Sequence, residues 1–139
     1  MNFLRGLIKV KKELIITIIV LSLFGLNANS QAAIGHNRID ILNRYANYGI
    51  QSSVRKDGLN QALFQTENML VIYYFNEDDI CKETVISPLN FYSQKAYFEK
   101  FDKQYTRVDA TNWTFTVNGI LHYVHYEKVA EYGMFWFHL

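Results

Sequence analysis

The chain has 139 residues, of which 50% are hydrophobic and 16% aromatic, and its formal net charge at pH 7 is +1. This length and apolar content predict a single folded domain with many large side chains to bury, without need of disulfide bonds. A single cysteine excludes an internal disulfide, and the longest basic run after residue 30, Arg55-Lys56, is too short to predict a nucleic-acid-binding patch.

The first thirty residues have the pattern of an export signal peptide, in which a basic start precedes a short apolar run and a small-x-small cleavage site. The thirteen residues 14–26 form the apolar run, and residues 28–30 match the cleavage site, with residues 30–32 as a second possibility. An uncleaved membrane anchor is the alternative, but such a helix requires about 20 apolar residues. We therefore expect a secreted or periplasmic protein. The basic start is formed by Arg5, Lys9, Lys11 and Lys12.

Residues 31–139 are expected to form the mature protein, a single domain of 109 residues. Four of the 14 basic residues and one of the 13 acidic residues precede residue 31, so this domain carries a net charge near −2. A negative charge argues against nucleic acid and against an anionic membrane surface, since both require basic patches. We expect neither among its partners once the signal is cleaved.

The first predicted element of the mature part is an amphipathic helix that begins after Asn37 and ends before Gly49. Residues 50–55 are ambiguous, and Asp57-Gly58 then predicts a tight turn. Strands are predicted at residues 59–65, 69–75 and 80–86. The second of these (MLVIYYF) is apolar on both faces, which is typical of a central strand covered on both sides.

The second predicted helix begins at Pro88, is capped by Ser87 and continues to about Gln104. Strands follow at residues 112–117, 120–126 and 132–139, and the type I′ turn residues Asn118-Gly119 join the first two. The order α-βββ-α-βββ predicts an α+β fold, with an antiparallel sheet of about five to six strands and two helices packed on one face. The similar halves favour an internal duplication. Four aromatic residues at helical spacing predict the buried face of this helix: Phe91, Phe98, Phe101 and Tyr105.

No motif in the sequence indicates catalysis, a cofactor or a metal, so we expect no catalytic, cofactor-binding or metal-binding residues. His122 and His125 have a metal-like spacing, but residues three apart on a strand point to opposite faces. The acidic run at residues 76–79 lacks the alternating ligands and the glycine of a calcium loop, and it is typical of a solvated hairpin tip.

Cys81 alternates with Glu83 and Val85, so the three are predicted to share one face of their strand. No histidine or second cysteine lies nearby in the sequence to activate the thiol, which favours a buried, unreactive Cys81. A thiol available for intermolecular pairing is the alternative.

Four features together resemble short exported proteins of unknown function from Bacteroidetes. Beside the signal peptide, these are the strand at residues 71–75 (VIYYF), Cys81 six residues later, the helix opening at residues 87–90 (SPLN), and Trp113 in a hairpin. The resemblance covers residues 69–137. It implies export and a single small domain, and it implies no mechanism.

The aromatic residues exceed what a thin two-layer core needs, so we expect some of them to form a binding surface. We therefore hypothesise a non-enzymatic module that binds an unknown macromolecule or a carbohydrate through an aromatic sheet face. The alternative is a cone like that of nuclear transport factor 2, with a closed ligand-binding or catalytic pocket into which an acid and His122 or His125 would point. The candidate binding surface consists of Trp113, Tyr123, Tyr126 and Trp136.

Overall fold

A computed structural model gives the structure of the protein, and it describes residues 33–139. The predicted export signal lies outside the described residues. The described elements are α2 (Arg38–Arg44), the 3-10 helix η1 (Ala46–Tyr48), β1 (Gln51–Val54), β2 (Asn60–Gln65), β3 (Met69–Phe75), β4 (Cys81–Pro88), α3 (Phe91–Gln104), β5 (Thr106–Asp109), β6 (Asn112–Val117), β7 (Ile120–Lys128) and β8 (Gly133–His138).

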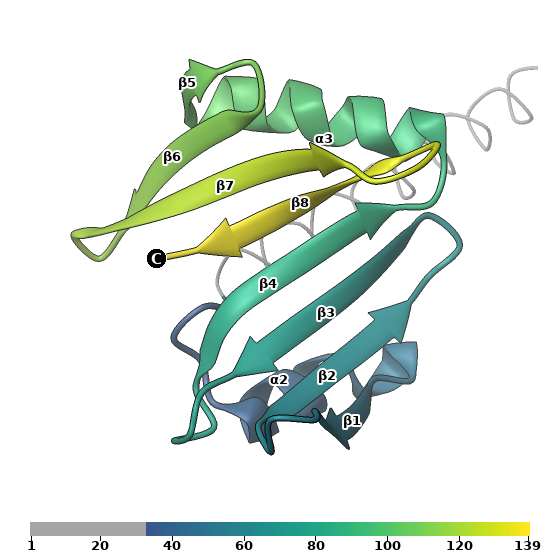
Figure 1. Cartoon of the computed structure of the whole chain (residues 1–139), viewed down its shortest axis with the longest axis vertical. Helices are drawn as coiled ribbons and strands as arrows, with labels where there is room; N and C mark the ends of the chain where they lie inside the picture. The colour runs from purple at the N-terminus through teal and green to yellow at the C-terminus, as the bar shows by residue number, and fades with distance from the viewer. Residues whose placement is uncertain (1–32) are drawn as a thin grey trace, which may run out of the picture. The chain divides into compact units, whose positions relative to one another are not determined.

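The eight strands form one antiparallel sheet with the order β1-β2-β3-β4-β8-β7-β6-β5 (Figure 1). Each half of the described chain is a helix followed by a four-stranded meander, and the last strands of the two meanders, β4 and β8, pair at the centre. The predicted α+β class with an antiparallel sheet is confirmed. The predicted five to six strands and the order α-βββ-α-βββ are wrong, because each half contains a fourth strand.

The two strands that the sequence did not predict are the edges of the sheet, β1 and β5. Both have four residues, all of them exposed. β1 reads Gln-Ser-Ser-Val and β5 reads Thr-Arg-Val-Asp, so neither has the apolar alternation on which strand prediction depends. Short polar edges discourage pairing with another chain, which explains why these strands lack the expected pattern.

Both helices pack on the same face of the sheet, which we call the covered face. Tyr45, at the end of α2, stacks on Phe64 and Tyr73 at centroid distances of 4.9 and 5.7 Å. Phe101 of α3 packs edge-on against Phe135 and Phe137 at 5.0 and 5.6 Å. Tyr73 and Phe137 are both register neighbours of Thr84, so these contacts lie on one side of the sheet. Figure 1 views the sheet from the other side, with α2 and α3 behind it.

Helix α3 begins later than the sequence predicts. Its N-cap is Asn90, whose side-chain oxygen accepts a hydrogen bond from the backbone N–H of Ser93 at 2.8 Å. Pro88 is instead the last residue of β4, paired with Met69, so the predicted cap at Ser87 and helix start at Pro88 are wrong. Phe91, the first residue of the helix, is 68% exposed, so its predicted place on the buried face is wrong, whereas Phe101 is buried as predicted. Strand pairing, which sequence signals for caps do not reveal, decides this boundary.

A β-bulge at the start of β4 changes which residues share a face. Tyr74 pairs with Glu83, but Phe75 pairs with Cys81, so Lys82 is the extra residue. Cys81 therefore turns to the covered face beside Phe75, while Glu83 and Val85 lie on the opposite face. The predicted shared face of these three residues is wrong for this reason, and the predicted burial of Cys81 is confirmed.

Candidate functional site

The face of the sheet opposite the helices is the candidate site, and we call it the open face. In the part of the chain that the structure describes, no helix packs on it (Figure 1). Its central side chains come from β2, β3, β4, β8 and β7, and they are Leu63, Leu70, Ile72, Tyr74, Glu83, Val85, Met134, Trp136, His138, Tyr123 and His125.

The strand register arranges these side chains in rows that cross the sheet. One row is apolar in the middle and polar at its ends, and it consists of Gln51, Leu63, Ile72, Val85, Trp136, His125 and Asn112. The next row is polar and aromatic, and it consists of Ser53, Gln61, Tyr74, Glu83, His138, Tyr123 and Thr114. Directly opposed side chains on adjacent strands are in contact range, so each row is a continuous strip.

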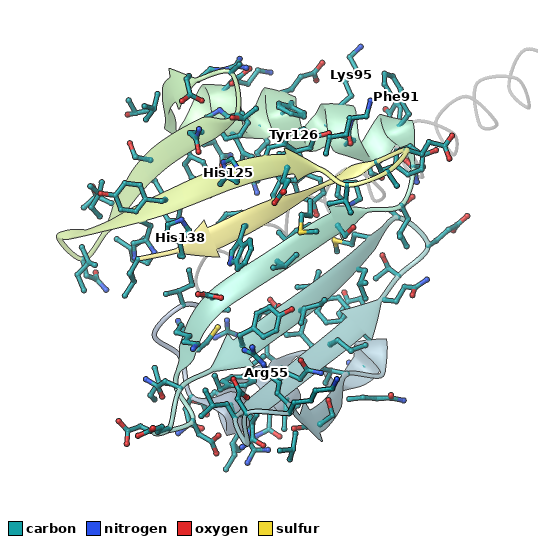
Figure 2. All side chains as sticks on the ribbon, viewed as in Figure 1. Arg55, Phe91, Lys95, His125, Tyr126 and His138 are labelled. Atoms are coloured by element: carbon teal, nitrogen blue, oxygen red, sulfur yellow. The ribbon has the colours of Figure 1, made fainter. Side chains whose placement is uncertain are left out.

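Two hollows lie on the open face, on either side of Trp136. The larger, of about 400 Å³, is lined by Arg55, Leu70, Ile72, Tyr74, Glu83, Val85, Ser87, Met134 and Trp136. The smaller, of about 290 Å³, is lined by Glu83, His125, Trp136 and His138. Glu83 and Trp136 line both, so the two hollows adjoin, and we call the pair the groove, in which the larger hollow is the apolar end and the smaller is the polar end. Figure 2 labels His125 and His138 at the polar end of the groove, and Arg55 toward the edge of the sheet formed by β1 and β2.

Contacts on the open face fix several of its side chains. The His138 ring stacks on Tyr123 at 5.5 Å, and the Nδ1 atom of His125 lies 2.7 Å from the side-chain oxygen of Asn112. The Arg55 guanidinium lies over the Tyr74 ring at 4.9 Å, a cation–π contact. By contrast, the indole N–H of Trp136 is buried and has no acceptor among the described residues.

The four predicted binding residues do not lie on one face. Tyr123, which is 42% exposed, and Trp136 lie on the open face. Trp113 is fully buried under α3, where its indole N–H donates to Asp102 at 2.9 Å. Tyr126 also lies on the covered face, with its ring 4.7 Å from Phe98. Only two of the four residues are therefore available to a partner at the open face.

Sequence reasoning missed the other half of the groove. Ile72 and Tyr74 of β3 and Met134 of β8 line it together with Glu83. Alternation within each strand places Ile72 with Tyr74 and Met134 with Trp136, and this signal was present in the sequence. The pairing of β4 with β8, which brings the two sets together, joins strands about fifty residues apart and carries no local signal.

Burial shifts the pKa values of several side chains between the sheet and the helices. Burial raises the pKa of the Cys81 thiol to about 11, so it is not a nucleophile at neutral pH. Burial also lowers the pKa of His122, whose ring stacks on Phe115 at 4.9 Å, and that of Lys100 to about 8. Within residues 33–139, no three His, Cys, Asp or Glu side chains are placed to hold a metal ion.

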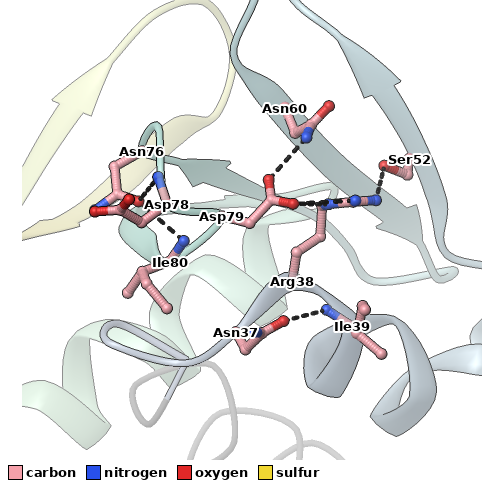
Figure 3. Close-up of polar contacts among 9 residues, drawn as sticks. All are labelled: Asn37, Arg38, Ile39, Ser52, Asn60, Asn76, Asp78, Asp79 and Ile80. Carbon is pink, nitrogen blue, oxygen red and sulfur yellow. Dashed lines mark hydrogen bonds and ion pairs between the residues drawn. The ribbon is translucent and has the colours of Figure 1, made fainter.

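A polar cluster joins α2 to the β3–β4 hairpin, and its groups are satisfied by each other (Figure 3). Asp79 accepts hydrogen bonds from Asn60 at 2.7 Å and from Arg38 at 3.1 Å, and Arg38 also reaches Ser52. The bond from Asn60 and then that from Arg38 lower the pKa of the Asp79 carboxyl. These hydrogen bonds tie the helix to the sheet.

Aromatic rings occupy the interface between α3 and the sheet. Phe101, Phe135 and Trp113 are fully buried and within 6.1 Å of each other between centroids. His122 lies on this covered face and His125 on the open face, as their spacing predicted.

The chain matches no protein-family model, and comparison with curated proteins and with solved structures gives no significant match. The interpretation of the open face therefore depends on its own geometry. Among the helices of residues 33–139, none has the length and apolar character that crossing a membrane requires.

Proposed function

We propose that the protein is an exported, non-enzymatic binding module, and that a partner protein binds to its open face with Trp136 at the centre. One observation carries this proposal: within residues 33–139, the apolar middle of an eight-stranded sheet has no helix on one side, and Trp136 lines two hollows there. The basic and apolar pattern of residues 1–30 supports the export of the module.

The composition of the open face supports the proposal. Protein interfaces combine an apolar centre with a polar rim, and Trp, Tyr, Met and Arg are enriched in them. The open face has Ile72, Val85 and Met134 at its centre and Arg55, Glu83 and the two histidines around them. Tryptophan is also among the residues that most often dominate the binding free energy of an interface.

The indole N–H of Trp136, which has no acceptor among the described residues, is a second observation that supports the proposal. A buried N–H without an acceptor costs free energy relative to an apolar side chain of similar size. Trp136 therefore contributes less to stability than Trp113, which has an acceptor in Asp102. A large aromatic side chain in this setting is better explained by binding than by folding.

The aliphatic centre of the groove favours a protein over a carbohydrate. Leu70, Ile72 and Val85 offer no polar atom to the hydroxyl groups of a sugar, whereas apolar side chains of a partner would fill the same space. A carbohydrate partner is thus an outcome that the experiment must distinguish.

Selection from a displayed library of random nine-residue peptides tests the proposal, with the exported protein purified from cells that express the full chain. We expect binding peptides whose affinity falls at least tenfold in Trp136→Ser, since the loss of a central tryptophan from an interface is typically about 2 kcal/mol. Phe91→Ser is the matched control, because Phe91 is an exposed aromatic residue of α3.

The same proteins are then applied to a glycan array, and circular dichroism confirms that both variants fold. Binding to glycans alone, with loss in Trp136→Ser, would replace the protein partner by a carbohydrate. Equal binding by the wild-type protein and Trp136→Ser would refute the open face as the site.

A further inference from the structure

We propose that the partner is bound as an extended segment in which a large apolar residue and a lysine or arginine stand two positions apart. The apolar side chain fills the larger hollow beside Trp136, and the basic side chain pairs with Glu83. This inference rests on the proposed function and adds to it the chemistry that the groove selects.

Glu83 is a carboxylate that the described part of the chain leaves without a cation. It lines both hollows, and its register neighbours are Tyr74 on β3 and His138 on β8. None of the ion pairs among residues 33–139 includes it. Arg55, the cation that lines the same hollow, lies over the Tyr74 ring and pairs with Asp57 at 3.5 Å. The charge of Glu83 is thus available to a ligand.

The other charges of the open face agree with a cationic ligand. Glu127 lies on this face opposite Met134, at the exposed end of β7. Because Arg55 pairs with Asp57, Glu83 is the charged residue lining the hollows that has no ion pair among the described residues, and Glu127 adds a further negative charge to the same face of the sheet. Complementary charge of this kind speeds association and selects among partners. An acidic segment would be repelled, so the groove discriminates against it as well.

The larger hollow is the reason why we expect an apolar side chain in the bound segment. Leu70, Ile72, Val85 and Met134 line it, and its volume of about 400 Å³ corresponds to roughly a dozen water molecules. A side chain such as that of Leu, Met or Phe displaces water from these surfaces, which gives the favourable free energy of apolar burial.

The separation of two positions between the apolar residue and the basic residue of the bound segment follows from strand geometry. Val85 and Glu83 are two residues apart on β4 and point to the same face, so their side chains are roughly 7 Å apart along the strand. Side chains at positions i and i+2 of an extended peptide have the same separation. A segment that runs along β4 therefore places one side chain over Val85 and the other beside Glu83.

The peptide selection is repeated with three proteins: the wild type, Glu83→Lys, and Glu67→Lys as the control. Glu67 is exposed in the turn between β2 and β3, so its replacement changes the net charge equally at a distance from the groove. Wild type and Glu67→Lys are expected to enrich a basic residue two positions from a large apolar one. Glu83→Lys is expected to enrich an acidic residue there instead.

Affinities for the best wild-type peptide are then measured by fluorescence polarisation. We expect at least tenfold weaker binding by Glu83→Lys, an intermediate loss for Glu83→Gln, and a change below twofold for Glu67→Lys. Selected peptides without basic residues, or Glu83→Lys binding as the wild type does, would overturn the inference. If Trp136→Ser still abolished binding in that case, the proposed function would stand. If Trp136→Ser also bound normally, or no peptide were selected, both would fall.

Discussion

The covered face and the open face of the same sheet differ in what their aromatic residues do. Along β8, Phe135 and Phe137 are fully buried under α3, whereas Met134 and Trp136 on the other side of the strand are only partly buried. The two tryptophans of the chain divide in the same way, with Trp113 on the covered face and Trp136 on the open face. One side of this apolar strand therefore builds the core, and the other lies on the face that no helix covers among residues 33–139.

The difference has a physical origin in the number of layers. Two helices cover a sheet of eight strands, and both lie on one side, so the described chain provides no second layer for the other. Apolar groups on the covered face lose their contact with water on folding. On the open face Val85 is buried, whereas Ile72 and Met134 keep partial contact with water and would lose it only if something else covered them.

The largest expected effect is a difference in the free energy of unfolding between a substitution on the covered face and one on the open face. Phe101→Ala removes a ring that contacts Phe135, Phe137 and Trp113, and we expect a loss of about 3–5 kcal/mol in the free energy of unfolding. Ile72→Ala, on the open face, is the control, and we expect about 1 kcal/mol or less because its side chain keeps access to water. Urea unfolding followed by circular dichroism measures both. Equal losses would break the distinction between the faces.

An intermediate effect is expected from the two tryptophans. Trp113→Phe loses the hydrogen bond to Asp102 and leaves a small cavity, for which we expect about 2 kcal/mol of destabilisation. Trp136→Phe loses no hydrogen bond, and we expect a change within about 0.5 kcal/mol.

Each of these variants also leaves a single tryptophan as a fluorescent reporter. Acrylamide should quench the emission of Trp136 in Trp113→Phe more strongly than that of Trp113 in Trp136→Phe, because only Trp136 lies on the open face. Equal quenching of the two would show that the open face is covered in solution.

The smallest expected effect concerns the polar cluster around Asp79, which holds α2 to the sheet. The pKa of Asp79 is lowered from its ordinary value of 3.8, so its stabilising effect is complete above that value and is lost as the pH falls through the lowered one. We expect the free energy of unfolding of Asp79→Asn to fall less steeply below pH 5 than that of the wild type. Asparagine tolerates the positive φ of 59° at this position.

Urea titrations at pH 7, 5, 4 and 3 measure these slopes, with Glu67→Gln as a control carboxylate in an exposed turn. Parallel pH profiles for Asp79→Asn and the wild type would show that the cluster does not contribute in this way. In that case the packing of Tyr45 on Phe64 and Tyr73 would be left as the main attachment of α2.

Much of the architecture was predictable because it depends on local signals. Asn118 and Gly119 both have positive φ, at 50° and 78°, as a type I′ turn requires, and Gly49 ends the first helical segment in the left-handed conformation. The strong apolar strands β3, β6, β7 and β8 were predicted within a few residues. The edge strands and the start of α3 were not, since backbone pairing with a neighbour decides them.

Half of the candidate site was predictable, and the other half was not. Tyr123 and Trp136 were identified as exposed aromatic candidates, but Trp113 and Tyr126 have the same residue chemistry and lie under α3. Residue type alone does not distinguish these positions. The face of each strand follows from its alternation, but which face the helices cover depends on the path of the chain between elements that are distant in sequence.

The sequence by itself determined that this chain folds as an antiparallel sheet with two helices, because apolar periodicity and turn residues act over a few neighbouring positions. Only the tertiary structure decided that both helices cover one side, that β4 meets β8, and that a bulge turns Cys81 to the covered face while Glu83 lies on the open face. These features depend on contacts between residues far apart in the chain. The free energy of such contacts comes from tertiary packing, which local sequence patterns do not reveal.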